Sequence, residues 1–251
     1  MKTPLVLTAI VKPIQLTDEE QKSNLLNWIT GISQLAGIYL ILENNFTSKQ
    51  IKDALYLAKA LEFIHSLKLN NLAVHLGYTN TEAFLYSIAN PDSVSIGVYE
   101  NLRSFGIKRF KNLEKGQMRG PNPRIYSGAL LQWIDYGYLG AIQKIYSKWG
   151  TLFEESKYKP LMFTPSFQWH FQKPELYKHS FSVFANQITE LPPDLSTRTN
   201  KVASLINTAR TTFNEPTDAG IFLDPDSDGS HLSFWLTAIS LYKKYLAEAG
   251  L

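Results

Sequence analysis

The sequence contains no cysteine. This excludes disulfides, thiolate nucleophiles and cysteine-ligated zinc or iron–sulfur centres, and it is typical of a reducing compartment. The sequence also lacks any apolar run near the roughly 18 residues that a membrane-spanning helix needs. Its net charge is only +3 over 251 residues, so the total charge does not indicate a nucleic-acid ligand. We therefore expect a cytoplasmic protein with no membrane partner.

Short apolar runs alternate with helical patterns over the first hundred residues. Because strand and helix alternate with short links, this order predicts parallel βαβ units with right-handed crossovers. The first run ends at Pro13 without a small-residue cleavage site, so we interpret it as a buried strand rather than a signal sequence. Thr17 is the expected N-cap of the first helix and Ser48 that of the second. The expected strands are Leu5–Val11, Gly37–Leu42, Leu72–Leu76 and Val94–Val98.

The second half of the chain has a looser pattern. Its helical spacing predicts helices over 127–149, 174–191, 195–213 and 230–249, and two further short runs, 161–164 and 220–223, are candidate strands. This makes about six strands, whereas a closed (β/α)₈ barrel has eight. We predict a single α/β domain with a TIM-like barrel, incomplete or atypical, and a helix-rich C-terminal half. Two strands missed by the pattern, or strands supplied by a partner chain, are the alternatives.

Polar side chains follow the predicted strands at their carboxyl ends, where the active sites of parallel α/β folds lie. Glu43 follows the second strand, His75 lies on the third, and Glu100 follows the fourth. A histidine between two carboxylates suits general acid–base catalysis, so these three are the candidate catalytic residues. The alternative is that His75 is a core histidine with its hydrogen bonds satisfied.

A basic stretch follows the fourth predicted strand. Seven Lys and Arg residues stand against one acid, Glu114, between Arg103 and Arg124, with aromatic residues interleaved. Basic side chains neutralise phosphates and aromatic faces stack on bases, so this loop predicts a site for RNA, DNA or a nucleotide. A solvated loop whose charges only aid solubility is the alternative. The candidate binding residues are Arg103, Lys108, Arg109, Arg119, Arg124 and Tyr126.

Acidic residues at 224, 226 and 228, followed by a glycine, resemble the start of a calcium-binding loop. The twelfth position of the loop is Trp235 instead of a bidentate Glu, so a polar turn that caps the last helix explains the pattern more simply. The chain has no Walker loop, GxGxxG, HExxH or GxSxG motif. We predict no metal site and no cofactor.

The segment from Leu72 to Phe110 has a strand ending in a glycine turn, a short helix, a strand and then a loop arginine. This layout resembles the later barrel strands of tRNA-guanine transglycosylases, and resembles uncharacterised bacterial and phage relatives of that superfamily more closely. The resemblance implies that Arg103 lies on the nucleic-acid side. It also implies that Ile96 or Gly97 stands where the family has its nucleophilic Asp, and the family's zinc-binding cysteines are absent.

Three hypotheses follow from the sequence. The first is a transglycosylase-like barrel that binds nucleic acid or a nucleotide through the basic loop, with lost or altered chemistry. The second is a TIM-barrel enzyme that acts on a small polar or phosphorylated substrate. The third is a non-catalytic subunit of a larger assembly, in which a protein partner completes the barrel.

Overall fold

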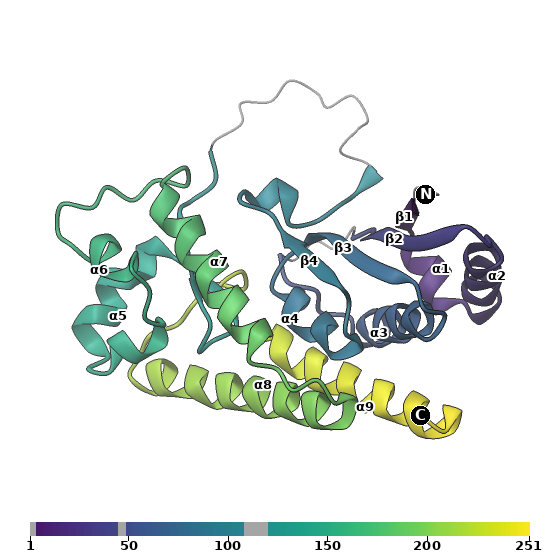
Figure 1. The fold of residues 1–251 in the computed structure, drawn as a ribbon. Coiled ribbons are helices and arrows are strands. Elements are labelled where there is room, and N and C mark those ends of the chain that lie inside the picture. Colours follow the sequence, from purple (N-terminus) through teal and green to yellow (C-terminus); the bar gives the residue numbers. More distant parts are fainter. Residues whose placement is uncertain (1–3, 45–48, 108–119) are drawn as a thin grey trace.

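The protein is described by a computed structural model that covers residues 4–44, 49–107 and 120–251 (Figure 1). Four strands form one parallel sheet in the order β1-β2-β3-β4. All four overlap the apolar runs from which strands are predicted, so the parallel α/β organisation of the first hundred residues is confirmed. The strands are β1 (Leu5–Val11), β2 (Leu35–Leu42), β3 (Ala73–Thr79) and β4 (Ser93–Ile96).

Helices connect the successive strands. They are α1 (Pro13–Thr17), α2 (Glu19–Thr30), α3 (Ala54–Leu69), α4 (Glu82–Tyr86) and the 3-10 turn η1 (Ser87–Ala89). Asp18 and Asp53 cap α2 and α3, because each carboxylate accepts a hydrogen bond of 2.9 Å from a backbone N–H of the first turn. The first cap therefore lies one residue after the predicted Thr17, and Ser48 lies outside the described residues.

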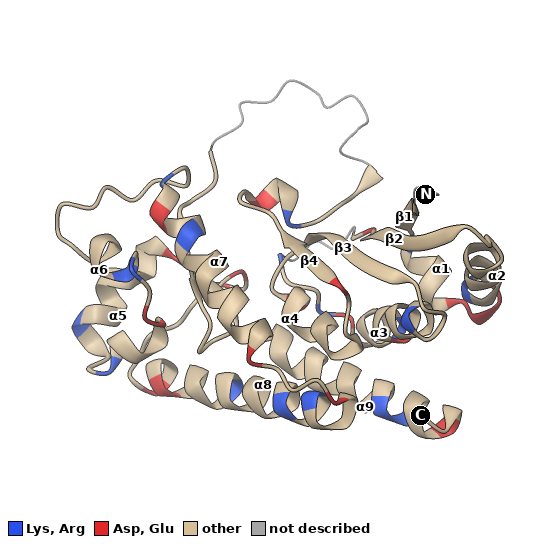
Figure 2. Cartoon of the chain, in the orientation of Figure 1, with Lys and Arg blue, Asp and Glu red and all other residues tan. Residues whose placement is uncertain are grey.

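The two faces of the sheet have different environments. On one face, Ile38, Leu40 and Val74 are fully buried against the connecting helices, which lie on that side of the sheet (Figure 1). On the other face Val6 and Ile10 are 48% and 45% exposed. None of the four strands contains a charged residue (Figure 2). Because parallel sheets are normally covered on both faces, the exposed apolar face is an unusual feature of the described structure.

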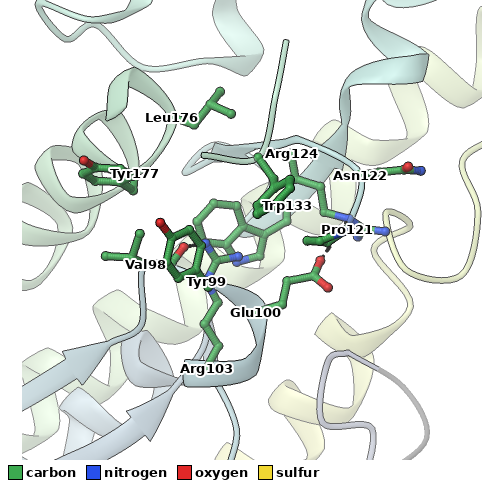
Figure 3. A pocket seen from close by; sticks show the side chains of 11 residues that line it. Val98, Tyr99, Glu100, Arg103, Pro121, Asn122, Arg124, Trp133, Leu176 and Tyr177 are labelled. Atoms are coloured by element: carbon green, nitrogen blue, oxygen red, sulfur yellow. Dashed lines mark hydrogen bonds and ion pairs between the residues drawn. The ribbon is translucent and has the colours of Figure 1, made fainter. Parts of the chain in front are cut away.

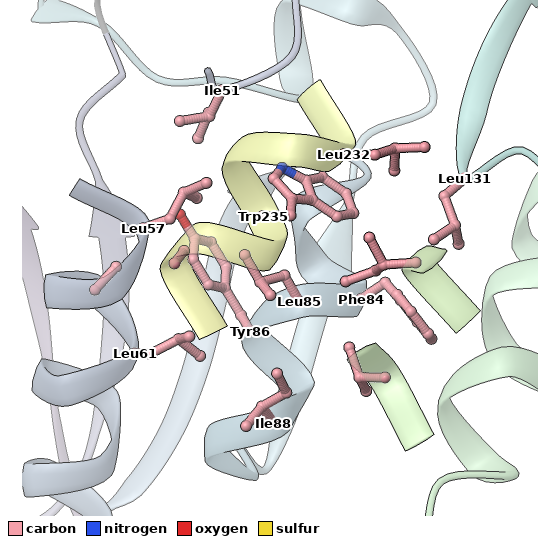
Figure 4. Close-up of a cluster of buried hydrophobic side chains, with 14 of the residues drawn as sticks. Ile51, Leu57, Leu61, Phe84, Leu85, Tyr86, Ile88, Leu131, Leu232 and Trp235 are labelled. Carbon is pink, nitrogen blue, oxygen red and sulfur yellow. The ribbon is translucent and has the colours of Figure 1, made fainter. Parts of the chain in front are cut away.

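The C-terminal half packs beside and beneath this sheet. Trp235 of the last helix is fully buried in an apolar cluster that also contains Leu57, Leu61 and Tyr86 (Figure 4). One buried cluster therefore contains residues from both halves. The elements are the antiparallel hairpin β5 (Arg124–Ser127) and β6 (Gln132–Asp135), α5 (Leu139–Ile145), α6 (Lys159–Met162), α7 (Pro174–Thr189), α8 (Leu195–Asp218), α9 (His231–Ala249) and the 3-10 turns η4 (Tyr136–Tyr138) and η5 (Trp149–Leu152).

Three predictions for the second half are wrong. The predicted helix over 127–149 is replaced by the hairpin turn, β6, η4 and α5, and Leu131 makes the turn with a left-handed φ of 51°. The predicted strand at 161–164 overlaps α6, and 220–223 is not a strand. Short apolar runs carry too little periodicity to separate strand from helix. The described residues thus form four parallel strands and one hairpin, and a closed barrel is not seen among them.

Candidate functional site

The carboxyl end of β4 meets the C-terminal half at a small cleft. It encloses about 30 Å³, which is enough for one or two water molecules. Its walls come from the loop after β4, the residues before and on β5, β6, and the start of α7 (Figure 3). A larger ligand would therefore have to lie at the mouth of this cleft. The lining residues are Val98, Tyr99, Glu100, Arg103, Pro121, Asn122, Arg124, Trp133, Phe171, Leu176 and Tyr177.

Arg103 is the buried anchor of the cleft. Its guanidinium donates to the carbonyl oxygens of Gly97 and Val98 at 2.9 and 2.8 Å, and its carbon lies 3.6 Å from the ring centroid of Trp133. Burial lowers the pKa of Arg103 to about 10, against the opposing effect of Glu100, and Arg124 lowers it further. The side chain therefore stays charged at neutral pH. Through these contacts Arg103 holds the loop after β4 against β6. Arg103 therefore positions the wall of the cleft.

An alternating set of charges closes one side of the cleft. Lys49 lies 2.9 Å from Glu100 and 3.6 Å from Asp226, and Arg124 lies 3.4 and 3.7 Å from the same two carboxylates. With Arg103, three cationic side chains stand beside two anionic ones, and Asp135, which pairs with Arg124 in the hairpin register and accepts from Asn122 at 2.9 Å, adds a third carboxylate. The carboxylates of Glu100 and Asp226 are about one third exposed, so their ion pairs are screened by water and an incoming phosphate would compete with them.

Aromatic rings surround the mouth. Tyr99 is 40% exposed and meets Phe171 edge to face with centroids 6.2 Å apart. Trp133 lies deeper, where its indole N–H donates to Oδ1 of Asn80 at 2.8 Å. The carboxyl end of β3, which Asn80 follows, is thereby tied to the hairpin. The exposed ring of Tyr99 is the group best placed to stack on a flat ligand.

Tyr126, one of the predicted binding residues, does not line this mouth. Tyr126 is fully buried, stacks on Phe184 at 4.0 Å and donates to Gln187 at 3.0 Å, so it presents no face to a base. Tyr126 lies on β5, which packs against α7, and Phe184 of that helix covers its ring. Lys108, Arg109 and Arg119 lie outside the described residues.

The predicted catalytic residues do not converge. Glu43 accepts from the N–H of Ile107 at 2.9 Å, His75 pairs with the hydroxyl of Ser93 at 2.8 Å, and Glu100 belongs to the charge cluster. Within the described residues no hydrogen bond or ion pair joins any two of the three. His75 lies on the exposed face of the sheet, because β3 residues alternate between the faces, and is therefore not the predicted core histidine either.

The acidic turn before α9 binds its own backbone, and Ser230, the N-cap residue of α9, makes no side-chain cap hydrogen bond, so the predicted capping role is wrong. Oδ1 of Asp224 accepts from the backbone N–H of Asp226 at 2.9 Å, and Oδ1 of Asp228 accepts from that of Ser230 at 3.0 Å. Asp226 is turned to Lys49 and Arg124 instead. The described residues contain no group of three or more His, Asp or Glu side chains arranged to share a metal ion.

Ile96 and Gly97, where the resemblance to transglycosylases would place the nucleophile, are both closely packed. A Cβ added to Gly97 would lie 2.4 Å from that of Leu102 and 2.5 Å from the Leu102 carbonyl carbon, so a side chain there would force the loop apart. Ile96 packs against the buried cluster of Tyr126 and Trp133. Gly97 therefore allows the loop after β4 to fold closely over itself, and Ile96 anchors the loop by apolar packing.

No protein-family model matches the chain, and no curated protein or solved structure does either. The transglycosylase resemblance therefore remains a prediction. Sequence patterns assigned Arg103 and Arg124 to the binding site and Glu100 to a separate catalytic set, and they missed Trp133, Phe171 and Tyr177, which come from distant segments. No local signal marks those three rings as a set, since Trp133 stands in a largely apolar run whereas Phe171 and Tyr177 have polar and charged neighbours.

Proposed function

We propose that this protein binds single-stranded nucleic acid or a nucleotide at the mouth of the Tyr99–Arg103–Arg124 cleft. The observation that carries the proposal is the exposed ring of Tyr99 beside the cations of Lys49 and Arg124, whose carboxylate partners are about one third exposed. A base would stack on Tyr99. The phosphate attached to that base would displace Glu100 or Asp226 and pair with Lys49 and Arg124 instead. Stacking tolerates any base, so we expect weak sequence preference.

Chemistry on the bound ligand is not part of the proposal. The candidate acids and base at the strand ends have separate partners, and Gly97 is packed under Leu102. A binding protein related to a transglycosylase-like barrel, without the family's base exchange, fits these contacts better than an enzyme on a small phosphorylated substrate.

Replacing Tyr99 by alanine is expected to weaken binding of a short fluorescent oligonucleotide by about 5- to 100-fold, because loss of one base–aromatic stack costs roughly 1–3 kcal/mol. Fluorescence anisotropy with DNA and RNA versions would measure it. Trp28 is the matched control, because it is an exposed aromatic residue on α2, and Trp28→Ala should bind like the unmodified protein.

The salt dependence of the same titration provides an independent criterion. Affinity should fall about threefold per phosphate contact for each fourfold rise in salt. Affinity that ignores salt, or that Tyr99→Ala leaves unchanged, would reject the proposal.

We also propose, as a second candidate, a subunit on whose exposed sheet face another protein chain packs. Val6 and Ile10 are nearly half exposed on a face with no charged strand residue, and such patches mark interfaces.

With the purified protein alone, a second copy is the chain available to cover this face. Light scattering should then give a mass above that of one chain, and Ile10→Lys should return it to a monomer, since a buried lysine would lose its hydration. A monomer at every accessible concentration would leave only a different protein as the partner. Trp28→Lys, on the helical side, is the control and should leave the mass unchanged.

A further inference from the structure

A second cavity lies at the carboxyl ends of β2 and β3, below the start of α4. It encloses about 10 Å³, which is close to the smallest space that holds one water molecule. Its polar lining consists of Asn44, Tyr56, Thr79, Glu82 and Tyr86. It is separate from the cleft at Tyr99, with which it shares no lining residue.

Two buried polar atoms in this lining have no hydrogen-bond partner among the described atoms, namely Oε2 of Glu82 and the hydroxyl of Tyr86. Glu82 and Tyr86 are 4% and 1% exposed. Four residues separate them on α4, so both side chains leave the helix on the same side. Figure 4 shows the ring of Tyr86 between Leu57 and Leu61 of α3 and Trp235 of α9, so the ring lies in apolar surroundings, whereas Tyr56 and Glu82 act on its hydroxyl. Buried polar groups in folded proteins are nearly always paired, often through an internal water.

The other contacts of Glu82 are satisfied. Its Oε1 accepts from the backbone N–H of Asn80 at 2.9 Å, which holds the carboxyl at the end of β3. The hydroxyl of Tyr56 donates to the carbonyl of Glu43 at 3.1 Å and closes the cavity on the side of α3. Only one side of the Glu82 carboxyl therefore needs a partner.

We infer that this cavity is a binding site for one ordered water molecule, held between Oε2 of Glu82 and the hydroxyl of Tyr86. A protonated Glu82 donates its O–H to the water, and the water and the Tyr86 hydroxyl form the second hydrogen bond. Water, rather than a cation, is the ligand because the space holds one small molecule and its two unpartnered groups, a protonated Glu82 and the Tyr86 hydroxyl, carry no negative charge. The other titratable groups around the cavity are Glu43 and Asp53, which act on Tyr56, and Tyr56, which acts on Tyr86.

Burial supports the neutral form of Glu82, because it raises the pKa of the carboxyl from 4.5 to about 7 against two backbone hydrogen bonds that lower it. Between these two values the folded protein binds more protons than the unfolded chain. The stabilisation from this group is complete below 4.5 and is lost as the pH rises through 7.

Thermal or denaturant unfolding at a series of pH values tests the acid half of the inference. For the unmodified protein, Glu82 should lower the folding equilibrium constant by roughly 50- to 100-fold from about pH 5 to about pH 8. Glu82→Gln stays neutral and keeps an oxygen for the N–H of Asn80, so that decline should largely disappear. A decline of the same size in Glu82→Gln would show that Glu82 does not hold the proton.

Tyr86→Phe and a high-resolution crystal structure test the water. If the hydroxyl of Tyr86 binds water, its removal should lower the folding equilibrium constant, whereas removal of an unpaired buried hydroxyl would raise it. Electron density should show one water within hydrogen-bond distance of both atoms in the unmodified protein. Absence of that density, a more stable Tyr86→Phe, or a melting temperature that rises with ammonium or potassium beyond the effect of sodium would each overturn the inference.

Discussion

Replacing Arg103 by alanine is expected to lower the free energy of unfolding by about 3 kcal/mol. Hydrogen bonds from a charged donor contribute about 1.5–3 kcal/mol, and a desolvated cation–π contact about 2 kcal/mol. The variant would lose two such hydrogen bonds, to Gly97 and Val98, and the contact with Trp133. Denaturant unfolding followed by tryptophan fluorescence would measure the change.

Arg103→Lys distinguishes positioning from phosphate binding. An ammonium group keeps the charge, but it cannot lie flat on Trp133 while donating in a fork to two carbonyl oxygens. We therefore expect Arg103→Lys to recover less than half of the lost stability and to bind oligonucleotide nearly as weakly as Arg103→Ala. Full binding by Arg103→Lys would indicate a charge contact with the ligand instead. Arg210 is exposed on α8, and Arg210→Ala should stay within about 0.5 kcal/mol of the unmodified protein.

Removing the carboxylate of Glu62 is expected to have the largest effect on stability, about 3–5 kcal/mol for Glu62→Ala. Oε2 of Glu62 lies 2.9 Å from the amine of Lys22 and 2.8 Å from that of Lys59, and it joins α3 to α2. The side chains of Glu62 and Lys22 are 4% and 9% exposed. In Glu62→Ala, the buried ammonium of Lys22 would keep its ion pair with Glu19, which lies on the solvent side, and would lose its buried partner.

A paired replacement is the control for this site. Because burying two charges has a desolvation cost of its own, Lys22→Met combined with Glu62→Leu should be far less destabilising than Glu62→Ala. Urea denaturation of the three proteins would give the comparison. A loss below about 1 kcal/mol in Glu62→Ala would mean that Lys22 reaches water without its partner.

Local pattern predicted the first half of the fold well. Each of β1 to β4 overlaps one of the four predicted strands, although β3 contains His75 and β4 alternates Ser with Val and Ile. These signals work because burial against one helical layer selects the residue type at every position of a strand or helix face. The same signals failed over 127–164 and at 220–223, and the hairpin around Leu131 depends on the packing of Trp133 against Tyr126 and Phe184. They succeeded again for the helices predicted over 174–191, 195–213 and 230–249, which correspond to α7, α8 and α9.

The candidate site was predictable only in part. Sequence indicated the loop after β4 with Arg103 and Arg124, whereas it assigned Glu100 to a separate catalytic set with Glu43 and His75; in the structure all three of Glu100, Arg103 and Arg124 line one cleft. It did not indicate that the guanidinium of Arg103 donates to backbone carbonyl oxygens and stacks on an indole ring, or that Tyr126 is buried. Such roles depend on side chains that are far apart in sequence, so no spacing rule contains them.

By itself, the sequence determined that this is an α/β protein without cysteine chemistry, with a parallel βαβ unit and a locally basic loop after its fourth strand. Only the tertiary structure decided how these parts are used. It separated Glu43, His75 and Glu100, placed Tyr99 at the mouth of a charged cleft, and buried Glu82 beside Tyr86. The physical reason is that strand and helix preferences depend on neighbouring residues, whereas burial, ion pairing and cavities depend on which distant segments meet.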